Sequence, residues 1–305
     1  MGGYGDVQMI DENGLRVDGR GPADIRPVSI ETGVIPVADG SARVIWGTNH
    51  AVAAVYGPME AHPRKIQRQD RAVLDVRYNM APFSTTDRMR PGFNRRSREI
   101  SKVTADALES VVLLEMYPRS KIRIEIEILT AEAGTRCVGL TAASVALAHA
   151  GIPMTDMVVS VASGKINDVV VCDLNKEEDN YGEADLPMGI LPNTGELVFL
   201  QMDGDLSPAE FQEAWDYNME AALVVHQIMV EALKRGDDSS QSRSFHNYCV
   251  LIWLSWLRTI RDTMGVLAGI LGKPNFSSVS FRMPKDLQRS GWVTPSYTLA
   301  SNSKS

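Results

Sequence analysis

The stretch AEAGTRCVGLTAASVALAHAG, residues 131–151, combines a polar turn with an alanine-rich run. The run, Thr141–Ala150, predicts a helix packed inside the protein. Just before it, Gly134 allows close backbone approach, Thr135 offers a hydroxyl and Arg136 offers a planar fork of N–H donors. Beside the free N–H groups of a helix N-terminus, this tripeptide suits a small anion. It also fits a simple turn before a core helix, so the rest of the chain must decide between the two interpretations.

Composition excludes several classes of protein. The chain has 305 residues, 44% hydrophobic and 23% charged, which is typical of a globular protein of one or two domains. A net charge of −7 argues against non-specific coating of nucleic acid, but it does not exclude a local basic groove. Three distant cysteines, Cys137, Cys172 and Cys249, predict neither a disulfide framework nor a zinc site.

No segment predicts export or membrane insertion. The first residues lack the apolar core of a signal peptide. The apolar run Tyr248–Leu257 is followed by Arg258, Arg261 and Asp262, well before the ~20 residues that a spanning helix needs. We therefore expect a cytoplasmic protein with no membrane partner.

Hydrophobic periodicity predicts a mixture of strands and helices, that is, an α+β fold. We expect strands over residues 28–37, 42–46, 51–56, 72–80, 121–129, 157–162, 169–174, 184–191 and 197–202, and helices over 97–116, 141–150 and 207–235. Ser163-Gly164-Lys165 is predicted to be a turn, and residues 175–183 an acidic loop. Ser207 has the sequence of a helix cap, and the regular pattern of the last helix ends at Gly236.

A basic segment precedes the first predicted helix. Arg88–Arg98 holds five arginines in eleven residues around a Pro-Gly break. Such a run is often only a solvated face. Here the like charges lie at a helix N-terminus, where they oppose the helix dipole, and a bound anion would relieve that conflict. The segment is therefore a candidate anion or nucleic-acid contact.

Two acidic residues, Asp179 and Asp185, are the candidate catalytic or metal-binding pair. A loop folded onto the first turn of a strand can bring them together, although they are six residues apart. Paired carboxylates can hold Mg²⁺ or Mn²⁺, or give and take a proton. The alternative is that they are solvated acids among Glu177, Glu178 and Glu183.

The order of short motifs resembles that of the RNase PH family over roughly residues 12–236, most closely the catalytic RNase-PH-like subunits of archaeal exosomes. The matching motifs are Arg16-Val17-Asp18-Gly19-Arg20, Arg26-Pro27, Ala38-Asp39-Gly40-Ser41-Ala42, Tyr56-Gly57-Pro58, His62-Pro63-Arg64, Met80-Ala81-Pro82-Phe83-Ser84, Arg95-Arg96, Tyr117-Pro118-Arg119, Gly134-Thr135-Arg136, Asp173-Leu174-Asn175, Asp179 and Asp185-Leu186-Pro187. Each motif is weak alone, but their order and spacing identify the chain as a member of the family.

The resemblance implies a fold and an activity. The fold would be the RNase PH fold, two β-α subdomains similar to the second domain of ribosomal protein S5. The activity would be 3′→5′ phosphorolysis of RNA, in which inorganic phosphate attacks the terminal phosphodiester and releases a nucleoside diphosphate. The same site would add nucleotides in the reverse direction.

The resemblance also implies a role for each candidate residue. Gly134, Thr135 and Arg136 would hold the attacking phosphate. The RNA backbone would be gripped by Arg95 and Arg96, with Arg64 contacting RNA at the opening of a ring. Catalysis or metal binding would fall to Asp179 and Asp185, with Mg²⁺ or Mn²⁺ as the ion.

The resemblance further implies partners: single-stranded RNA 3′ ends, a homologous non-catalytic RNase PH-like subunit in a hexameric ring, and RNA-binding cap subunits, but no DNA. Two alternatives stay open, a non-catalytic RNA-binding ring subunit and a self-assembling RNase PH that trims tRNA 3′ ends. The domain is expected to span residues 15–236. Residues 1–14 would be a flexible segment, and residues 237–305, which lack Glu, an atypical tail that is disordered or spurious.

Overall fold

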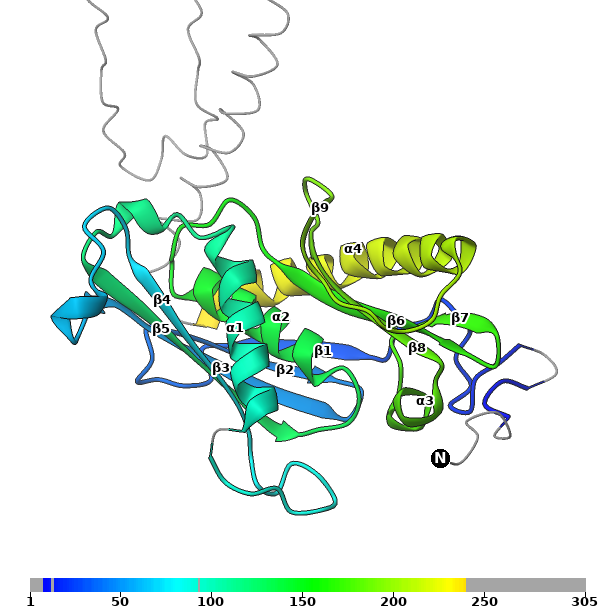
Figure 1. The fold of residues 1–305 in the computed structure, drawn as a ribbon. Coiled ribbons are helices and arrows are strands. Elements are labelled where there is room, and N and C mark those ends of the chain that lie inside the picture. The colour runs from blue at the N-terminus through cyan, green and yellow to red at the C-terminus, as the bar shows by residue number, and fades with distance from the viewer. Residues whose placement is uncertain (1–7, 12–13, 93, 240–305) are drawn as a thin grey trace, which may run out of the picture. The chain divides into compact units, whose positions relative to one another are not determined.

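A computed structural model describes residues 8–11, 14–92 and 94–239. Within them the chain forms two five-stranded sheets and four α-helices (Figure 1). The first sheet consists of β1 (Val28–Thr32), β2 (Gly40–Trp46), β3 (Asn49–Glu60), β4 (Val73–Met80) and β5 (Ser120–Thr130), and the second of β6 (Val159–Ile166), β7 (Val169–Cys172), β8 (Ala184–Leu191), β9 (Glu196–Leu200) and β10 (Asp203–Gly204). The helices are α1 (Arg95–Glu109), α2 (Thr135–His149), α3 (Lys176–Tyr181) and α4 (Pro208–Ser239). These elements confirm the predicted α+β class.

The first sheet brings two helix N-termini to one edge. Its order is β1-β2-β3-β5-β4, and all neighbours are antiparallel except β4 and β5, which run parallel. The chain leaves β4 and β5 at the same end of the sheet, and the helix that follows each strand, α1 or α2, begins there. A hydrogen bond from the backbone N–H of Ala131 to the carbonyl oxygen of Ser84, 2.8 Å long, holds the two connecting loops together. The parallel pair therefore positions the first turns of both helices.

Helix α2 lies in the core, in contact with β2, β3 and β5 of the first sheet and with β6 of the second. It begins at Thr135, six residues before the predicted start, and almost all of its residues are buried. Small side chains permit this packing. At Gly40, which begins β2, a Cβ atom would lie 2.4 Å from the carbonyl oxygen of Ala146. The start of β2 therefore packs directly against the backbone of α2.

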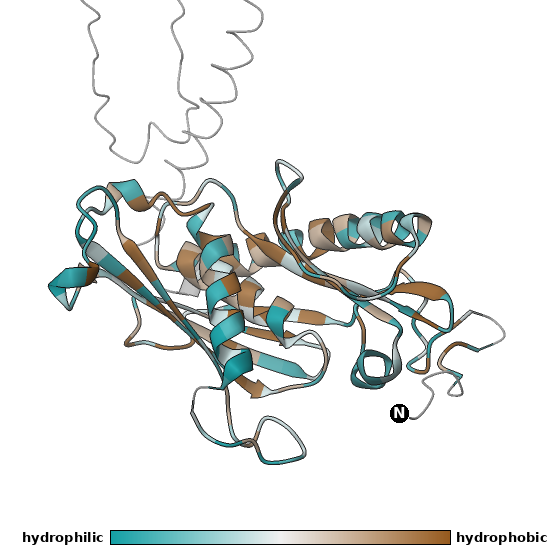
Figure 2. Cartoon of the chain, viewed as in Figure 1, coloured by the Kyte–Doolittle hydropathy of each residue, from teal (hydrophilic) through white to brown (hydrophobic). Residues whose placement is uncertain are grey.

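The other long helices pack on the sheets in different ways, since α1 lies on the first sheet and α4 contacts strands of both. Helix α1 packs on β4, and α4 packs on β1, β6 and β7. Figure 2 shows hydrophilic residues along the outer side of α1 and hydrophobic residues along the strands beneath it. Asn94 caps α1 by accepting a hydrogen bond from the N–H of Ser97 at 2.7 Å. The cap places the start of α1 two residues before the predicted Ser97, and the helix ends at Glu109 instead of continuing to Met116.

Two predictions for the second sheet were wrong. The predicted turn at Ser163-Gly164-Lys165 is part of β6, and the chain reverses instead at Asn167 and Asp168, both with positive φ. Glycine is needed at position 164 because the backbone of β8 comes very close there. A Cβ atom on residue 164 would lie 2.4 Å from the carbonyl oxygen of Ala184.

The predicted acidic loop contains helix α3. Asn175 accepts hydrogen bonds from the N–H groups of Glu177 and Glu178, while the Glu178 carboxylate accepts from the N–H of Asn175. This reciprocal capping box stabilises a helix of six residues.

Other boundaries moved by a few residues. The first strand ends at Thr32, because Gly33 has φ +73° and turns the chain. Helix α4 continues past Gly236 to Ser239. Of the expected flexible segment, residues 8–11 and 14 are described, and Met9 packs against Ile166 and Leu174. The expected tail lies outside the described residues from position 240 onward. Among the helices that the structure describes, none has the length and apolar character to cross a membrane.

Candidate functional site

The N-terminus of α2 presents free donors and a buried hydroxyl. Gly134 precedes the helix with φ +74°, a conformation that side chains with a Cβ atom rarely adopt, and it provides no side-chain cap. The first turn of α2 contains no acidic residue. Thr135 is buried, and its hydroxyl oxygen has no hydrogen-bond partner in the described structure. Arg136 lies beside it, partly exposed, with its guanidinium 3.3 Å from the Glu99 carboxylate on α1. The arrangement has the features of an anion site.

The start of α1 adds exposed positive charge to this region. Arg95 and Arg96 are the first two residues of the helix, and both are exposed. The charge of Arg96 acts on the carboxyl groups of Asp179 and Asp185. The structure therefore brings the basic segment to the same place as the α2 N-terminus, as the parallel pairing of β4 and β5 requires.

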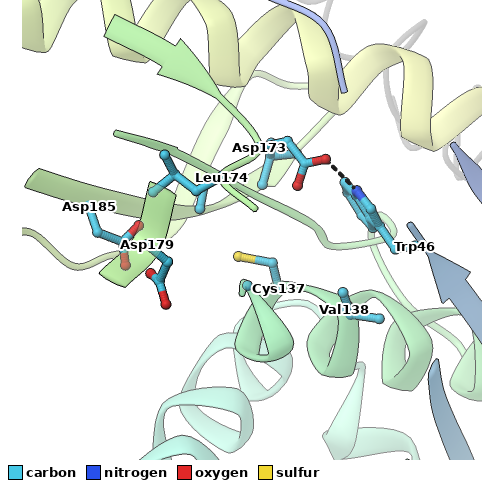
Figure 3. A pocket seen from close by; sticks show the side chains of 10 residues that line it. Trp46, Cys137, Val138, Asp173, Leu174, Asp179 and Asp185 are labelled. Carbon is cyan, nitrogen blue, oxygen red and sulfur yellow. Dashed lines mark hydrogen bonds between the residues drawn. The ribbon is translucent and has the colours of Figure 1, made fainter. Parts of the chain in front are cut away.

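Asp179 and Asp185 meet at one pocket (Figure 3). Asp179 comes from α3 and Asp185 from the second position of β8, and their side chains lie near each other at one end of the pocket. Gly134, which precedes α2, and Cys137 in its first turn line the same pocket. The acids thus face the helix start that carries Thr135 and Arg136. Part of α3 and the turn after it connect Asp179 to Asp185, which are six residues apart in the sequence.

Both carboxyl groups have raised pKa values. Loss of surrounding water raises the pKa of Asp185 to about 6, with a further contribution from the Asp179 carboxylate, while Arg136 opposes the shift. Desolvation also raises the pKa of Asp179, although its side chain is exposed at the pocket, and Arg96 lowers it. A carboxyl group with a pKa near 6 can exchange a proton close to neutral pH. The pair is therefore suited to acid–base chemistry or to binding a cation.

A buried ion network holds α3 in place. The guanidinium of Arg16 pairs with the Glu178 carboxylate, and both side chains are fully buried. Arg16 also donates to the carbonyl oxygens of Cys172 at 2.6 Å and Asp173 at 2.9 Å. Since Glu178 precedes Asp179 in α3, this network positions the candidate acid.

Asp173 forms a second buried contact behind the pocket. It has φ +54°, and its carboxylate accepts hydrogen bonds from the backbone and guanidinium of Arg26 and, at 2.9 Å, from the indole of Trp46. These contacts hold the pKa of Asp173 below its usual value against strong desolvation. They also fix the backbone between β7 and α3 in a conformation that few non-glycine residues adopt.

We expect Arg16→Ala to destabilise the fold by about 3–5 kcal/mol, because it leaves Glu178 buried without its partner. Thermal or urea unfolding measures the change. Arg43→Ala is the matched control, because the pair of Arg43 with Glu31 is partly exposed, at 36% and 52%, and such pairs contribute about 1 kcal/mol or less. Equal stability losses in the two variants would contradict a structural role for the buried pair.

Arg64 lies elsewhere. It is exposed in a short 3₁₀ helix, Arg64–Ile66, after β3. The backbone of Ala61, just before it, bonds to Arg119, which precedes β5. The α2 start follows the other end of β5, about 30 Å away along a strand of this length. Arg64 is thus not brought to the pocket, and its expected contact with RNA is a separate one.

Sequence reasoning missed the residues that support this site. Glu178, Asp173 and Arg26 entered only as loop acids or family motifs. A signal was available, because Asp173 ends an apolar strand and Asn175 with Glu178 has the spacing of a capping box. The partners of these groups are more than 100 residues away, so the pairing itself was not readable from local sequence.

A divalent cation fits the chemistry of the two acids. Mg²⁺ is commonly bound by one or two carboxylates together with waters and substrate phosphates. The described residues contain no group of three or more His, Cys, Asp or Glu arranged to hold a metal, so protein ligands would be limited to Asp179 and Asp185. Both have raised pKa values, and a cation would stabilise their ionised forms.

Comparisons with known proteins place the chain in a family. Residues 24–153 match the model "3' exoribonuclease family, domain 1", and residues 156–221 match "3' exoribonuclease family, domain 2". Exosome complex component Rrp41 of Thermococcus onnurineus is 56% identical over 234 residues, covering 77% of this chain and 94% of that protein. The same component of Thermoplasma volcanium is 53% identical over 227 residues, covering 74% and 92%. The chain therefore belongs to the RNase PH family of 3′ exoribonucleases.

Solved structures agree at the level of the fold. Rice Rrp46 superposes with a TM-score of 0.66 at 23% identity, covering 72% of this chain and 100% of that chain. A chain of the Archaeoglobus fulgidus exosome, solved with RNA bound to the active site, superposes with a TM-score of 0.62 at 24% identity, covering 70% and 92%. The predicted RNase PH fold is confirmed.

Proposed function

We propose that this 3′ exoribonuclease is the catalytic subunit of an exosome and shortens RNA by phosphorolysis, releasing nucleoside diphosphates. The observation that supports this most directly is the meeting of Asp179 and Asp185 with the first turn of α2 at one pocket. A non-catalytic RNA-binding subunit would not need a carboxyl group with a pKa near 6 facing an anion site. High identity to Rrp41 components along most of their length favours an exosome subunit over a tRNA-trimming RNase PH.

In this mechanism the chain positions two phosphates. Inorganic phosphate lies at the α2 N-terminus, held by the Thr135 hydroxyl, backbone N–H groups and the Arg136 guanidinium, with Gly134 allowing close approach. Arg95 and Arg96 bind the RNA backbone near its 3′ end. Positioning and charge neutralisation provide most of the catalysis in phosphoryl transfer, and arginines supply both.

The bond changes are balanced by one proton. An oxygen of inorganic phosphate forms a bond to the terminal phosphorus of RNA, and the bond from that phosphorus to the 3′ oxygen of the preceding nucleotide breaks. The protonated carboxyl group of Asp185 donates its proton to the departing 3′ oxygen. In the reverse direction the carboxylate removes the proton from a 3′ hydroxyl, and nucleotides are added to RNA.

Asp179 and Asp185 are also the residues that would hold Mg²⁺ or Mn²⁺, which when bound stabilises negative charge on the transferring phosphoryl group. In that role Asp179 assists through the ion or its waters, and Asp185 remains closest to the reacting atoms. Inorganic phosphate is the co-substrate in either case.

The proposed assembly follows from the family. A homologous non-catalytic RNase PH-like subunit would alternate with this one in a hexameric ring, with RNA-binding cap subunits above it. Single-stranded RNA 3′ ends would be threaded to the site, with Arg64 contacting RNA at the ring opening. The proposal includes a cytoplasmic location and no DNA or membrane partner.

A phosphate-dependence assay tests the proposed reaction. Purified protein, alone and with a candidate partner subunit, is incubated with poly(A) in the presence and absence of inorganic phosphate. Degradation is expected to require phosphate and to yield ADP, because the α2 N-terminus supplies the nucleophile's binding site. Formation of AMP at equal rates in phosphate-free buffer would replace phosphorolysis with hydrolysis.

The arginine pair is tested by charge reversal. The double variant Arg95→Glu, Arg96→Glu is expected to weaken RNA binding with little dependence on sequence, because contacts to phosphate position a strand without reading bases. The slope of log affinity against log salt should flatten by roughly 1–2, at about 0.7 per lost contact to single strands. Binding is measured by fluorescence anisotropy at several salt concentrations. An unchanged affinity and an unchanged slope would show that these arginines do not contact RNA and are only solvated surface residues.

A further inference from the structure

A buried tyrosine lies between the two helix starts of the site and has no assigned role. Tyr78 is on β4 and is fully buried, and its hydroxyl has no hydrogen-bond partner within the described residues. A buried polar group without a partner costs about 1–3 kcal/mol, so the position calls for an explanation.

Packing fixes where the Tyr78 ring lies. At Gly139, one turn after Thr135 on the same side of α2, a Cβ atom would lie 3.2 Å from the ring. On the other side, the backbone N–H of Tyr78 donates to the Ser101 hydroxyl at 2.8 Å, and that hydroxyl donates to the carbonyl of Ser97 in the first turn of α1. Tyr78 thus connects the helix starts that carry Arg96 and Arg136.

The surroundings of the hydroxyl define its possible partners. Burial raises the pKa of Tyr78, whereas the Thr135 hydroxyl and the charges of Arg96 and Arg136 lower it, so all three act on its oxygen. Guanidinium groups only donate hydrogen bonds. Among these three neighbours, Thr135 is therefore the acceptor available to the Tyr78 hydroxyl, and the Thr135 oxygen is itself buried without a partner.

We propose that Tyr78 is a positioning residue for the phosphate nucleophile: when phosphate binds, the Tyr78 hydroxyl donates to the Thr135 oxygen and leaves the single Thr135 hydrogen directed at the phosphate. A threonine hydroxyl has one hydrogen and two acceptor positions, and it rotates to suit its neighbours. Both hydroxyls are without a partner among the residues that the structure describes, so each is available to the other when phosphate binds. Arg136 and the N–H groups of α2 complete the site. This inference rests on the proposed phosphate dependence.

The test is a double-mutant cycle in the full chain, with whichever partner subunit activity requires. Tyr78→Phe removes only the hydroxyl and Thr135→Val removes the acceptor. Tyr78→Phe is expected to raise KM for inorganic phosphate about tenfold, since a hydrogen bond to a charged ligand is lost in part. RNA affinity should not change, and the melting temperature without phosphate should stay the same or rise. The double variant should be no worse than Thr135→Val alone.

Two readouts separate this role from a structural one. The stabilisation of the protein by inorganic phosphate should shrink in Tyr78→Phe, whereas Tyr217→Phe, whose hydroxyl bonds to Glu213 on the surface of α4, should match the wild type. An unchanged KM for phosphate in Tyr78→Phe, or strictly additive effects in the cycle, would overturn the inference. Phosphate-independent degradation by the wild type would instead overturn the proposed function.

Discussion

Asp185→Asn is expected to reduce both phosphorolysis and reverse polymerisation by about 10²–10⁴-fold, the usual contribution of a general acid or base. Both directions pass through one transition state, so one variant must affect both. The amide keeps the size of the side chain but can neither donate the proton nor hold a cation as a carboxylate does. RNA affinity should stay the same or rise, because a negative charge near the RNA phosphates is removed. The assay measures ADP release from poly(A) and, separately, poly(A) synthesis from ADP.

Two further variants give this prediction its controls. Asp179→Asn is expected to have a milder effect, because Asp179 lies on the short helix α3 and acts through an ion or water. Asp168→Asn is the matched control: its side chain is largely exposed and pairs with Lys165, outside the pocket. Near-normal turnover of Asp185→Asn at saturating Mg²⁺ would remove Asp185 from the catalytic role and favour the scaffold interpretation.

The pKa of Asp185 also predicts how stability depends on pH. Its value in the fold, about 6, is above the ordinary 3.8, so the folded state binds this proton more tightly than the unfolded chain. The carboxylate therefore destabilises the fold progressively as pH rises from about 4 to about 6. Asp185→Asn should be more stable than the wild type at pH 7–8, by ~3 kcal/mol at most, and equal below about pH 4. Thermal unfolding across this range, in metal-free buffer, measures the difference.

Arg136→Ala is expected to lower kcat/KM for phosphate by about 10²–10³-fold while leaving the fold intact. The guanidinium contacts a phosphate on which charge is redistributed during transfer, so its removal costs transition-state stabilisation. Its pair with Glu99 is partly exposed at 3.3 Å and contributes little to stability. Steady-state kinetics with varied phosphate, together with a melting curve, separate the two effects.

Two variants at other charged residues serve as controls for Arg136→Ala. Glu99→Gln removes the carboxylate that pairs with Arg136 and should leave phosphate affinity equal or slightly higher, because phosphate no longer competes with it. Arg43→Ala, on β2 and paired with Glu31, should match the wild type in activity. Equal losses in Arg136→Ala and Arg43→Ala would point to a general effect of positive charge and not to a phosphate contact.

The sequence by itself determined the family, the α+β class and the candidate residues. Most predicted strands are present with small shifts, because alternating apolar residues are a local signal. The core helix after Gly134 was also predictable, although its first turn was not, since Thr135, Arg136 and Cys137 do not resemble a helix start without their tertiary setting. Motif order over 200 residues indicated the family, and the comparisons confirmed it.

Only the tertiary structure decided how the candidates meet. The parallel pairing of β4 with β5 brings the starts of α1 and α2 to one edge, and the register of β8 against β6, with Asp185 opposite Gly164, presents that acid to the pocket. Pairings of this kind join residues far apart in the chain, and local sequence patterns do not predict which residues of two strands lie opposite each other. The same holds for Arg16 with Glu178 and for Tyr78 with Gly139. Arg16 and Glu178 carry charge, and residue 139 lacks a side chain, for reasons that exist only once distant segments have packed together.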